Sequence, residues 1–307
     1  MNDILRGRLE EISCGDVTFD CPLARYTSYA IGGPADVLVV VHKREKLAPL
    51  LAFLESEPIP WRVLGKGSNL LVSDEGYRGV AIILGKEFSQ IDEVEKRGKE
   101  TVSLCVGAGC SLTKLNHYCC RLGFEGMVFS YGIPGTLGGA ILMNAGAWGK
   151  EIAEVVTEVG VITRSGYEKL TGDQLDFTYR RWLGFSSYIG SGVIVDVTLS
   201  LSHGDSQLLE QQSKELLEKR KTTQPHTFPN GGSVFKNPIG DSAGRLIDKC
   251  GLKGETVGGA MVSKKHANFI INKKKATSED VRTLMITVQR AVKKRFGVEL
   301  EPEIHVI

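Results

Sequence analysis

Apolar residues recur along the chain with two periods, one typical of strands and one typical of helices. Short apolar runs of strand length occupy residues 37–41, 61–64, 70–73, 80–84, 101–106, 155–163 and 192–201. Apolar positions three or four residues apart predict helices at 46–55, 112–122 and 207–221, and a last helix from Thr277 or Ser278 to Gly297. The mixture of the two patterns predicts an α/β or α+β fold.

The length of the chain predicts more than one domain. A sequence of 307 residues exceeds one ordinary hydrophobic core, so we expect two or three. The pattern changes near residue 84 and again near 203, where a polar turn precedes a charged helix. We predict three consecutive domains at 1–84, 85–202 and 203–307, with the last strand returning to the active site.

Two segments rich in small residues interrupt the apolar pattern. The longer, YGIPGTLGGAILMNAGAWG, covers 131–149, and the shorter, VLGKGSNLLV, covers 63–72. Dense glycine indicates backbone with positive φ or a close approach to a ligand. Neither segment carries the Lys-Ser/Thr of a phosphate loop or the G-x-G-x-x-G of a dinucleotide turn. Two such loops can wrap a pyrophosphate with their N–H groups, or they can be two tight turns of an α+β domain.

Composition limits the class of protein. The residues are 42% hydrophobic and 24% charged, with a net charge of +2, as in an ordinary globular protein without a strong field for nucleic acid. No apolar run reaches the roughly 20 residues of a membrane span, and the first residues lack the apolar core of a signal peptide. We therefore expect a cytoplasmic protein with no membrane contact and no obligate protein partner.

Cysteine and histidine do not predict a metal site. The seven cysteines form no C-x-x-C pair, and we expect them to be reduced: Cys14, Cys21, Cys105, Cys110, Cys119, Cys120 and Cys250. The six histidines show no spacing typical of metal ligands, so no metal is expected.

Three polar residues stand out in tightly turned or apolar surroundings. Arg180, in DFTYR, has the side chain suited to a two-pronged grip on a carboxylate, although an ordinary ion pair would look the same. Ser233 follows two glycines, either as a presented hydroxyl or as a turn cap, and no G-x-S-x-G elbow surrounds it. Glu303 alternates with Ile304 and Val306, as a strand residue would, and alone it is an exposed carboxylate.

From about Tyr26 onward, the chain resembles the UDP-N-acetylenolpyruvoylglucosamine reductases, flavoenzymes of bacterial peptidoglycan precursor synthesis. The resemblance rests on YTSYAIGGPADVLV, VLGKGSNLLVSDEGYRGVAI, YGIPGTLGGAILMNAGAWG, FTYR, TTQPHTFPNGGSVFKNP, AGRLIDKCGLKG with VGGAMVSKKHANFIIN, and LEPEI, in this order. It implies a two-subdomain FAD-binding module of the vanillyl-alcohol-oxidase type, followed by an α/β substrate-binding domain.

The resemblance also implies where a non-covalent FAD would lie. Its pyrophosphate would lie against Gly65, Lys66, Gly67, Ser68, Asn69 and Leu70. Its flavin would be lined by Gly132, Ile133, Pro134, Gly135, Thr136, Gly138, Gly139, Asn144, Ala145 and Gly146.

The reaction that the resemblance implies is a two-step reduction. NADPH would give a hydride to FAD, and UDP-N-acetylglucosamine enolpyruvate would then be reduced to UDP-N-acetylmuramate. Arg180 would stabilise charge on the substrate carboxylate, Ser233 would protonate the neighbouring carbon with help from Lys236 or a water chain, and Glu303 would lie on the opposite side. The implied substrate-binding residues are Tyr179, Lys236, Asn237 and His266.

The sequence departs from the family pattern after Arg180. Arg181 and Trp182 replace the usual small or acidic residues, which leaves the local shape open. The insertion that carries a covering tyrosine is missing, which indicates the shorter subclass and leaves Arg181 or Tyr188 as candidates to close the site. Two rival functions are a flavin oxidase of the same fold and a nucleotide-binding regulator without chemistry. The segments GGSVFKNP and LEPEI argue against the oxidase, and Arg180, Ser233 and Glu303 together argue against the regulator.

Overall fold

The computed structural model describes residues 3–13, 15–95 and 101–307. They form two compact units built from interleaved segments. Unit 1 comprises Met1–Phe19, Asp36–Gly65 and Gly79–Glu218, and unit 2 comprises Asp20–Ala35, Lys66–Arg78 and Lys219–Ile307, apart from the residues not described. The two N-terminal stretches of unit 2 therefore pack with the C-terminal part of the chain. The boundaries 1–84, 85–202 and 203–307 stay a prediction.

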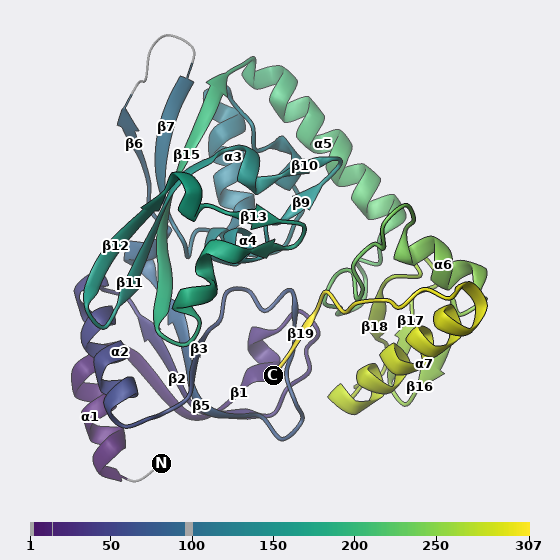
Figure 1. Cartoon of the computed structure of the whole chain (residues 1–307), viewed down its shortest axis with the longest axis horizontal. Coiled ribbons are helices and arrows are strands. Elements are labelled where there is room, and N and C mark those ends of the chain that lie inside the picture. The colour runs from purple at the N-terminus through teal and green to yellow at the C-terminus, as the bar shows by residue number, and fades with distance from the viewer. Residues whose placement is uncertain (1–2, 14, 96–100) are drawn as a thin grey trace. The chain divides into compact units, whose positions relative to one another are not determined.

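The first part of unit 1 is built on a four-stranded sheet with two helices beside it (Figure 1). The strands, in sheet order, are β1 (Asp16–Pro22), β2 (Pro34–Val41), β5 (Tyr77–Leu84) and β3 (Trp61–Val63). The helices are α1 (Asp3–Ser13) and α2 (Leu47–Ser56), and α2 buries one apolar face against the valines of β2. The core has the helical and strand periods expected from the sequence.

The second part of unit 1 is an antiparallel sheet of six strands. Its main path runs β12-β11-β15-β7-β6, with β8 paired to β15. The bounds are β6 (Ile91–Glu95), β7 (Thr101–Gly107), β8 (Phe124–Glu125), β11 (Val156–Thr163), β12 (Gly166–Thr171) and β15 (Gly192–His203). Helix α3 (Leu112–Leu122) packs on it, capped by Ser111 and ended by Gly123 at φ 69°. Both ends of this helix were predicted.

The glycine segment contains one short helix and leads into small hairpins. Helix α4 (Leu137–Leu142) begins after Thr136, whose hydroxyl caps it. Two hairpins follow, β9 (Gly146–Ala147) with β10 (Lys150–Glu151) and β13 (Phe177–Thr178) with β14 (Arg181–Trp182). Short 3-10 helices lie at Leu23–Tyr26, Arg44–Lys46, Lys86–Ser89, Val128–Ser130, Ile152–Glu154, Gly172–Gln174 and Leu183–Tyr188.

Unit 2 packs two helices on a small antiparallel sheet, and helix α5 (Ser206–Thr223) leads into it. The helices are α6 (Ala243–Lys249) and α7 (Ser278–Phe296), and the strands are β16 (Thr256–Val257), β17 (Ala260–Val262) and β18 (Ile270–Asn272). Thr277 caps α7 in a capping box with Asp280, and Gly297 ends it, as predicted. Strand β4 (Leu70–Leu71) lies parallel to β19 (His305–Val306) in the same unit.

Across the described residues, no helix is both long and apolar enough to cross a membrane. The six cysteines in this part of the chain are free thiols, whereas Cys14 lies outside the described residues.

Candidate active site

Arg180 lies in the turn of a tight hairpin. Thr178 pairs with Arg181 and Phe177 with Trp182, so Tyr179 and Arg180 form the two-residue connection. Arg180 has φ 61°, a left-handed conformation that few residues other than glycine adopt. The buried Trp182 holds the hairpin from beneath, because its ring stacks on Phe177 and its indole N–H donates to Gln174.

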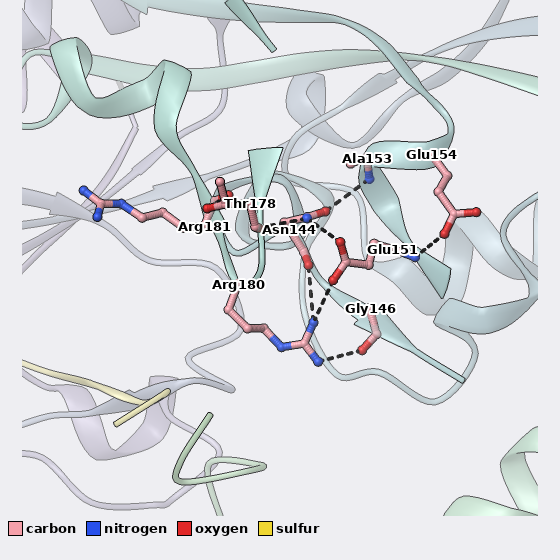
Figure 2. Close-up of polar contacts among 8 residues, drawn as sticks. All are labelled: Asn144, Gly146, Glu151, Ala153, Glu154, Thr178, Arg180 and Arg181. Atoms are coloured by element: carbon pink, nitrogen blue, oxygen red, sulfur yellow. Dashed lines mark hydrogen bonds and ion pairs between the residues drawn. The ribbon is translucent and has the colours of Figure 1, made fainter. Parts of the chain in front are cut away.

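The guanidinium of Arg180 is fixed by the segment that follows α4 (Figure 2). Its Nη2 donates to the Gly146 carbonyl at 3.1 Å, and its Nη1 donates to the Asn144 carbonyl at 3.5 Å. The Glu151 carboxylate lies 3.8 Å from Nη1. The Arg180 side chain is 17% exposed, so this cation is largely withdrawn from water and surrounded by acceptors.

Asn144 joins the hairpin of Arg180 to the glycine segment. Its buried side chain donates to the Glu151 carboxylate at 2.7 Å and to the Thr178 carbonyl at 3.0 Å, and it accepts from the Ala153 N–H at 3.2 Å. The side-chain amide of Asn144 is thus engaged within the protein. Its predicted contact with the flavin stays a prediction.

The residues after Arg180 settle the local shape that the sequence left open. The exposed Arg181 side chain extends away from Arg180 (Figure 2), and Trp182 is an anchor in the core. Tyr188 stacks on Phe185, and burial, followed by the hydrogen bond with Glu168, raises its pKa to about 12. These contacts engage Tyr188, and a role for Arg181 or Tyr188 in closing the site stays a prediction.

The shorter glycine loop, which the sequence predicts to be a phosphate cradle, packs closely on the segment around Tyr26. A Cβ on Gly67, which has φ 58°, would lie 2.1 Å from the Tyr26 carbonyl, so only glycine fits there. Within the described part of the chain, no protein acceptor takes the backbone N–H groups of Gly65, Lys66 or Gly67. Successive N–H groups of this kind suit a pyrophosphate.

The longer glycine segment is used differently at the start of α4. The N–H groups of Leu137, Gly138 and Gly139 donate to Cys110, Ala108 and Thr136 of the protein itself. The same Thr136 lies against Gly65, because a Cβ there would be 2.6 Å from its hydroxyl. The two loops predicted to hold one cofactor therefore meet, although the N-terminus of α4 is satisfied internally.

In unit 2, the structure brings the segments of Ser233 and Glu303 side by side. The Glu303 N–H donates to the Val234 carbonyl at 2.8 Å, and its carbonyl accepts from the Asn69 amide at 3.0 Å. Ser233 and Glu303 are both half-buried. The expectation that Glu303 lies in a strand is wrong, since β19 begins at His305 and Glu303 follows an isolated bridge at Pro302.

Two residues that sequence reasoning missed shape the Ser233 turn. Asn268 holds it from one side, because its side chain accepts from the Phe235 N–H at 3.0 Å and donates to the Phe235 carbonyl at 2.8 Å. Tyr29 lies on the other side, and its ring fills the space that a side chain on Gly231 would need. Burial raises the pKa of Tyr29 well above its usual value, so its hydroxyl stays protonated.

The predicted substrate-binding residues differ in how far their side chains are engaged within the protein. The ammonium of Lys236 pairs with Glu301 at 2.5 Å, and the Asn237 side chain accepts from the N–H of Ala243 at the start of α6. Tyr179 is 44% exposed, with the Arg180 guanidinium 4.9 Å from its ring centroid. The role of these residues in binding substrate stays a prediction.

His266 is held in one orientation in unit 2. Its Nδ1 accepts from the Asn268 N–H at 3.2 Å, and its ring meets the edge of Phe269. Burial, and then the charge of Lys253, lowers the pKa of His266. The neutral ring therefore carries its proton on Nε2. No group of metal-ligating side chains is found among the described residues.

Comparison with known proteins agrees with this architecture. The family described as UDP-N-acetylenolpyruvoylglucosamine reductase, C-terminal domain, matches residues 224–307, and the FAD binding domain family matches residues 35–171. UDP-N-acetylenolpyruvoylglucosamine reductase 2 of Symbiobacterium thermophilum is 47% identical over 288 residues, or 93% of this chain and 90% of that protein. The reductase of Bacillus subtilis is 37% identical over 300 residues, or 97% and 96%.

A solved structure extends the likeness to three dimensions. The crystal structure of UDP-N-acetylenolpyruvylglucosamine reductase from Thermus caldophilus matches with a TM-score of 0.76 at 35% identity, covering 95% of this chain and 98% of that one. The FAD-binding domain, with its paired glycine loops, defines a flavin-dependent oxidoreductase of the vanillyl-alcohol-oxidase type. More narrowly, the chain belongs to the UDP-N-acetylenolpyruvoylglucosamine reductase family.

Proposed function

We propose that this chain uses NADPH and FAD to reduce the enolpyruvoyl group of UDP-N-acetylenolpyruvoylglucosamine to the lactyl group of UDP-N-acetylmuramate. The observation that carries the proposal is the pairing of the Ser233 and Glu303 segments, joined at Val234 although about 70 residues separate them in the sequence. Bound FAD supplies the hydride chemistry, and the cradle at Gly65, Lys66 and Gly67 suits its pyrophosphate.

Arg180 acts on the substrate carboxylate. Hydride adds to the methylene carbon of the enolpyruvoyl group. Negative charge then develops on the carbon next to the carboxylate and spreads onto the carboxylate, where a guanidinium already held in place stabilises it without reorganisation. The contacts to Asn144 and Gly146 supply that hold. Tyr179, Asn237 and His266 bind other parts of the substrate.

Ser233 donates the proton that completes the reduction to the carbon next to the substrate carboxylate. Glu303 lies on the opposite side of that carbon. A serine hydroxyl is a weak acid and needs support from a neighbour. The Lys236 ammonium is directed at Glu301, so we assign this support to a water chain. The reaction takes place in the cytoplasm, where NADPH and nucleotide sugars are supplied, and it requires no protein partner.

An anaerobic titration followed by the visible spectrum tests the proposal. Purified protein loaded with FAD should lose its yellow colour with NADPH and regain it with UDP-N-acetylenolpyruvoylglucosamine. Ser233→Ala should leave the first step unchanged and slow the second by roughly two to four powers of ten, the usual contribution of a general acid.

Ser187→Ala is the matched control, because Ser187 is an exposed serine of unit 1, and it should behave like the wild-type protein. An unchanged second step in Ser233→Ala would remove Ser233 as the proton donor. Protein that stays bleached with this substrate, yet regains colour rapidly in air, would favour a flavin oxidase instead.

A further inference from the structure

We infer that Glu151 is a positioning residue for Arg180, acting through its carboxylate on the guanidinium and on Asn144. The inference rests on the proposed role of Arg180 in stabilising charge on the substrate. Glu151 lies just beyond the glycine segment, and all contacts that support the inference lie within unit 1.

A tight hairpin delivers the carboxylate. Glu151 pairs with Gly146 across β9 and β10, and the turn between them consists of Trp148 and Gly149, both with positive φ. A Cβ on Gly146 would lie 2.8 Å from Cγ of Glu151, so the Glu151 side chain occupies the space beside this glycine. Glycine at 146 is therefore what allows Glu151 to reach across the hairpin.

The two carboxylate oxygens have different partners (Figure 2). Oε2 accepts from the Asn144 amide at 2.7 Å, and Oε1 lies 3.8 Å from Nη1 of Arg180. The same guanidinium donates to the carbonyls of Asn144 and Gly146. The segment from 144 to 151 thus supplies a carboxylate and two carbonyls to one cation, and the charged acceptor among these three contacts is Glu151.

Glu151 is itself held in place. Its N–H donates to the Glu154 carboxylate at 2.9 Å, and its side chain caps the short helix Ile152–Glu154. Asn144, which Glu151 orients, continues the chain of contacts to the Thr178 carbonyl in the Arg180 hairpin. The backbone of Glu151 is therefore held in place, and its carboxylate is linked to Arg180 both directly and through Asn144.

This arrangement sets a direction for the guanidinium. The Arg180 side chain is long and flexible but only 17% exposed, and carbonyl acceptors alone do not balance the charge of a cation so far withdrawn from water. An anionic acceptor on one edge balances that charge and selects one rotamer. Because a displacement of about 1 Å can cost roughly a hundredfold in rate, loss of this anchor should affect the chemical step.

A double-mutant cycle tests the inference. Glu151→Gln keeps the size of the side chain, removes its charge and turns an N–H group toward Arg180. We expect it to slow reoxidation of the reduced enzyme by UDP-N-acetylenolpyruvoylglucosamine by roughly 10- to 100-fold. In an Arg180→Ala background, the same change should have no further effect, because the residue through which it acts is gone.

Binding supplies a second readout, independent of turnover. Calorimetry with the product UDP-N-acetylmuramate should show weaker binding in Glu151→Gln than in the wild type, and equal binding in Arg180→Ala and the double variant. Glu125→Gln is the matched control, since Glu125 is an exposed carboxylate of unit 1 on β8, and it should leave both readouts unchanged. If the glutamine variant does not fold, Glu151→Asp enters the same cycle, because it draws the carboxylate back by one methylene group. We then expect a slowing that again disappears in the Arg180→Ala background.

The two hypotheses fail in different ways. If the wild-type protein is not reoxidised by this substrate, the proposed function fails, and the inference fails with it. If the wild type is reoxidised but Glu151→Gln is silent, or its effect adds in full to that of Arg180→Ala, only the positioning role is overturned.

Discussion

His266 shows how its surroundings set the charge of one side chain in unit 2. Its ring is held by Asn268 and Phe269, and Gly244 leaves room for it, since a Cβ there would lie 3.2 Å from the ring. Burial and Lys253 favour the neutral form, and hence the pKa is lowered. A neutral imidazole with its proton on Nε2 can donate to a substrate oxygen without adding a charge.

The stability of the protein should therefore depend on His266 in mildly acidic solution. Because the folded pKa lies below the ordinary value of about 6.5, the unfolded chain takes up the proton first as the pH falls. The stability that neutral His266 contributes is fully present above a pH of about 6.5, and it is lost as the pH falls through the folded pKa. Thermal unfolding between pH 7.5 and 5 should show a steeper fall in Tm for the wild type than for His266→Asn. Parallel curves would contradict the cause given for the lowered pKa.

At the scale of elements, the β13–β14 hairpin combines a stable base with a strained turn. Trp182 and Phe177 stack at the base, with ring centroids 5.6 Å apart, while Arg180 in the turn has φ 61°. Turns with positive φ at the second central position normally place glycine or asparagine there. The positive φ of Arg180 costs folding stability, and strain of this kind is typical of residues at functional sites.

A pair of substitutions isolates that strain. Arg180→Gly and Arg180→Ala both remove the guanidinium contacts, so they differ mainly in the backbone preference at 180. Glycine adopts positive φ without a steric penalty, and we expect Arg180→Gly to be more stable than Arg180→Ala by about 1 kcal/mol. Denaturant unfolding of the two variants measures the difference. Equal or reversed stability would show that the turn is not strained.

Some elements were predictable from the sequence, and others were not, for physical reasons. Helices α3 and α7 have clear apolar stripes, a capping hydroxyl and a terminal glycine, and their bounds were predicted well. Helix α4 was missed because glycines at 138 and 139 lower its helical propensity, so it depends on its Thr136 cap and on packing. Arg180, Ser233 and Glu303 could be marked as candidates by residue type and by the family resemblance, and their catalytic roles stay predictions. Glu151 and Asn268 could not be marked, because their contacts are made by side chains folded against other segments.

At the scale of the whole molecule, interleaving of the segments decides what sequence reasoning can find. Residues 20–35 and 66–78 belong to unit 2 although the units change several times along the chain. Patterns read along the sequence divide a chain into consecutive blocks, so they do not detect this arrangement. The three cores, by contrast, consist of the apolar stripes that the sequence displays.

Binding of FAD should stabilise the molecule by mass action. A ligand present at 100 times its Kd, and bound only by the folded chain, adds about 2.7 kcal/mol to the free energy of unfolding. Cofactor-free protein should therefore unfold at a lower temperature, and Tm should rise with added FAD. Riboflavin, which lacks the pyrophosphate, is the control and should raise Tm less. An equal rise with riboflavin would argue against the phosphate cradle at Gly65, Lys66 and Gly67.

The pairing of β4 with β19 has a consequence for the order of events during synthesis. Asn69 binds the carbonyl of Glu303 across 234 positions, and Leu71 is bridged by Ile307. A growing chain would expose residues 66–71 long before their partners leave the ribosome. Closing so long a loop is slow, so unit 2 should be completed only after the last of these residues emerges. Until then, Lys66 and Gly67, which lie beside β4 in the sequence, would lack the support that β19 gives to that strand.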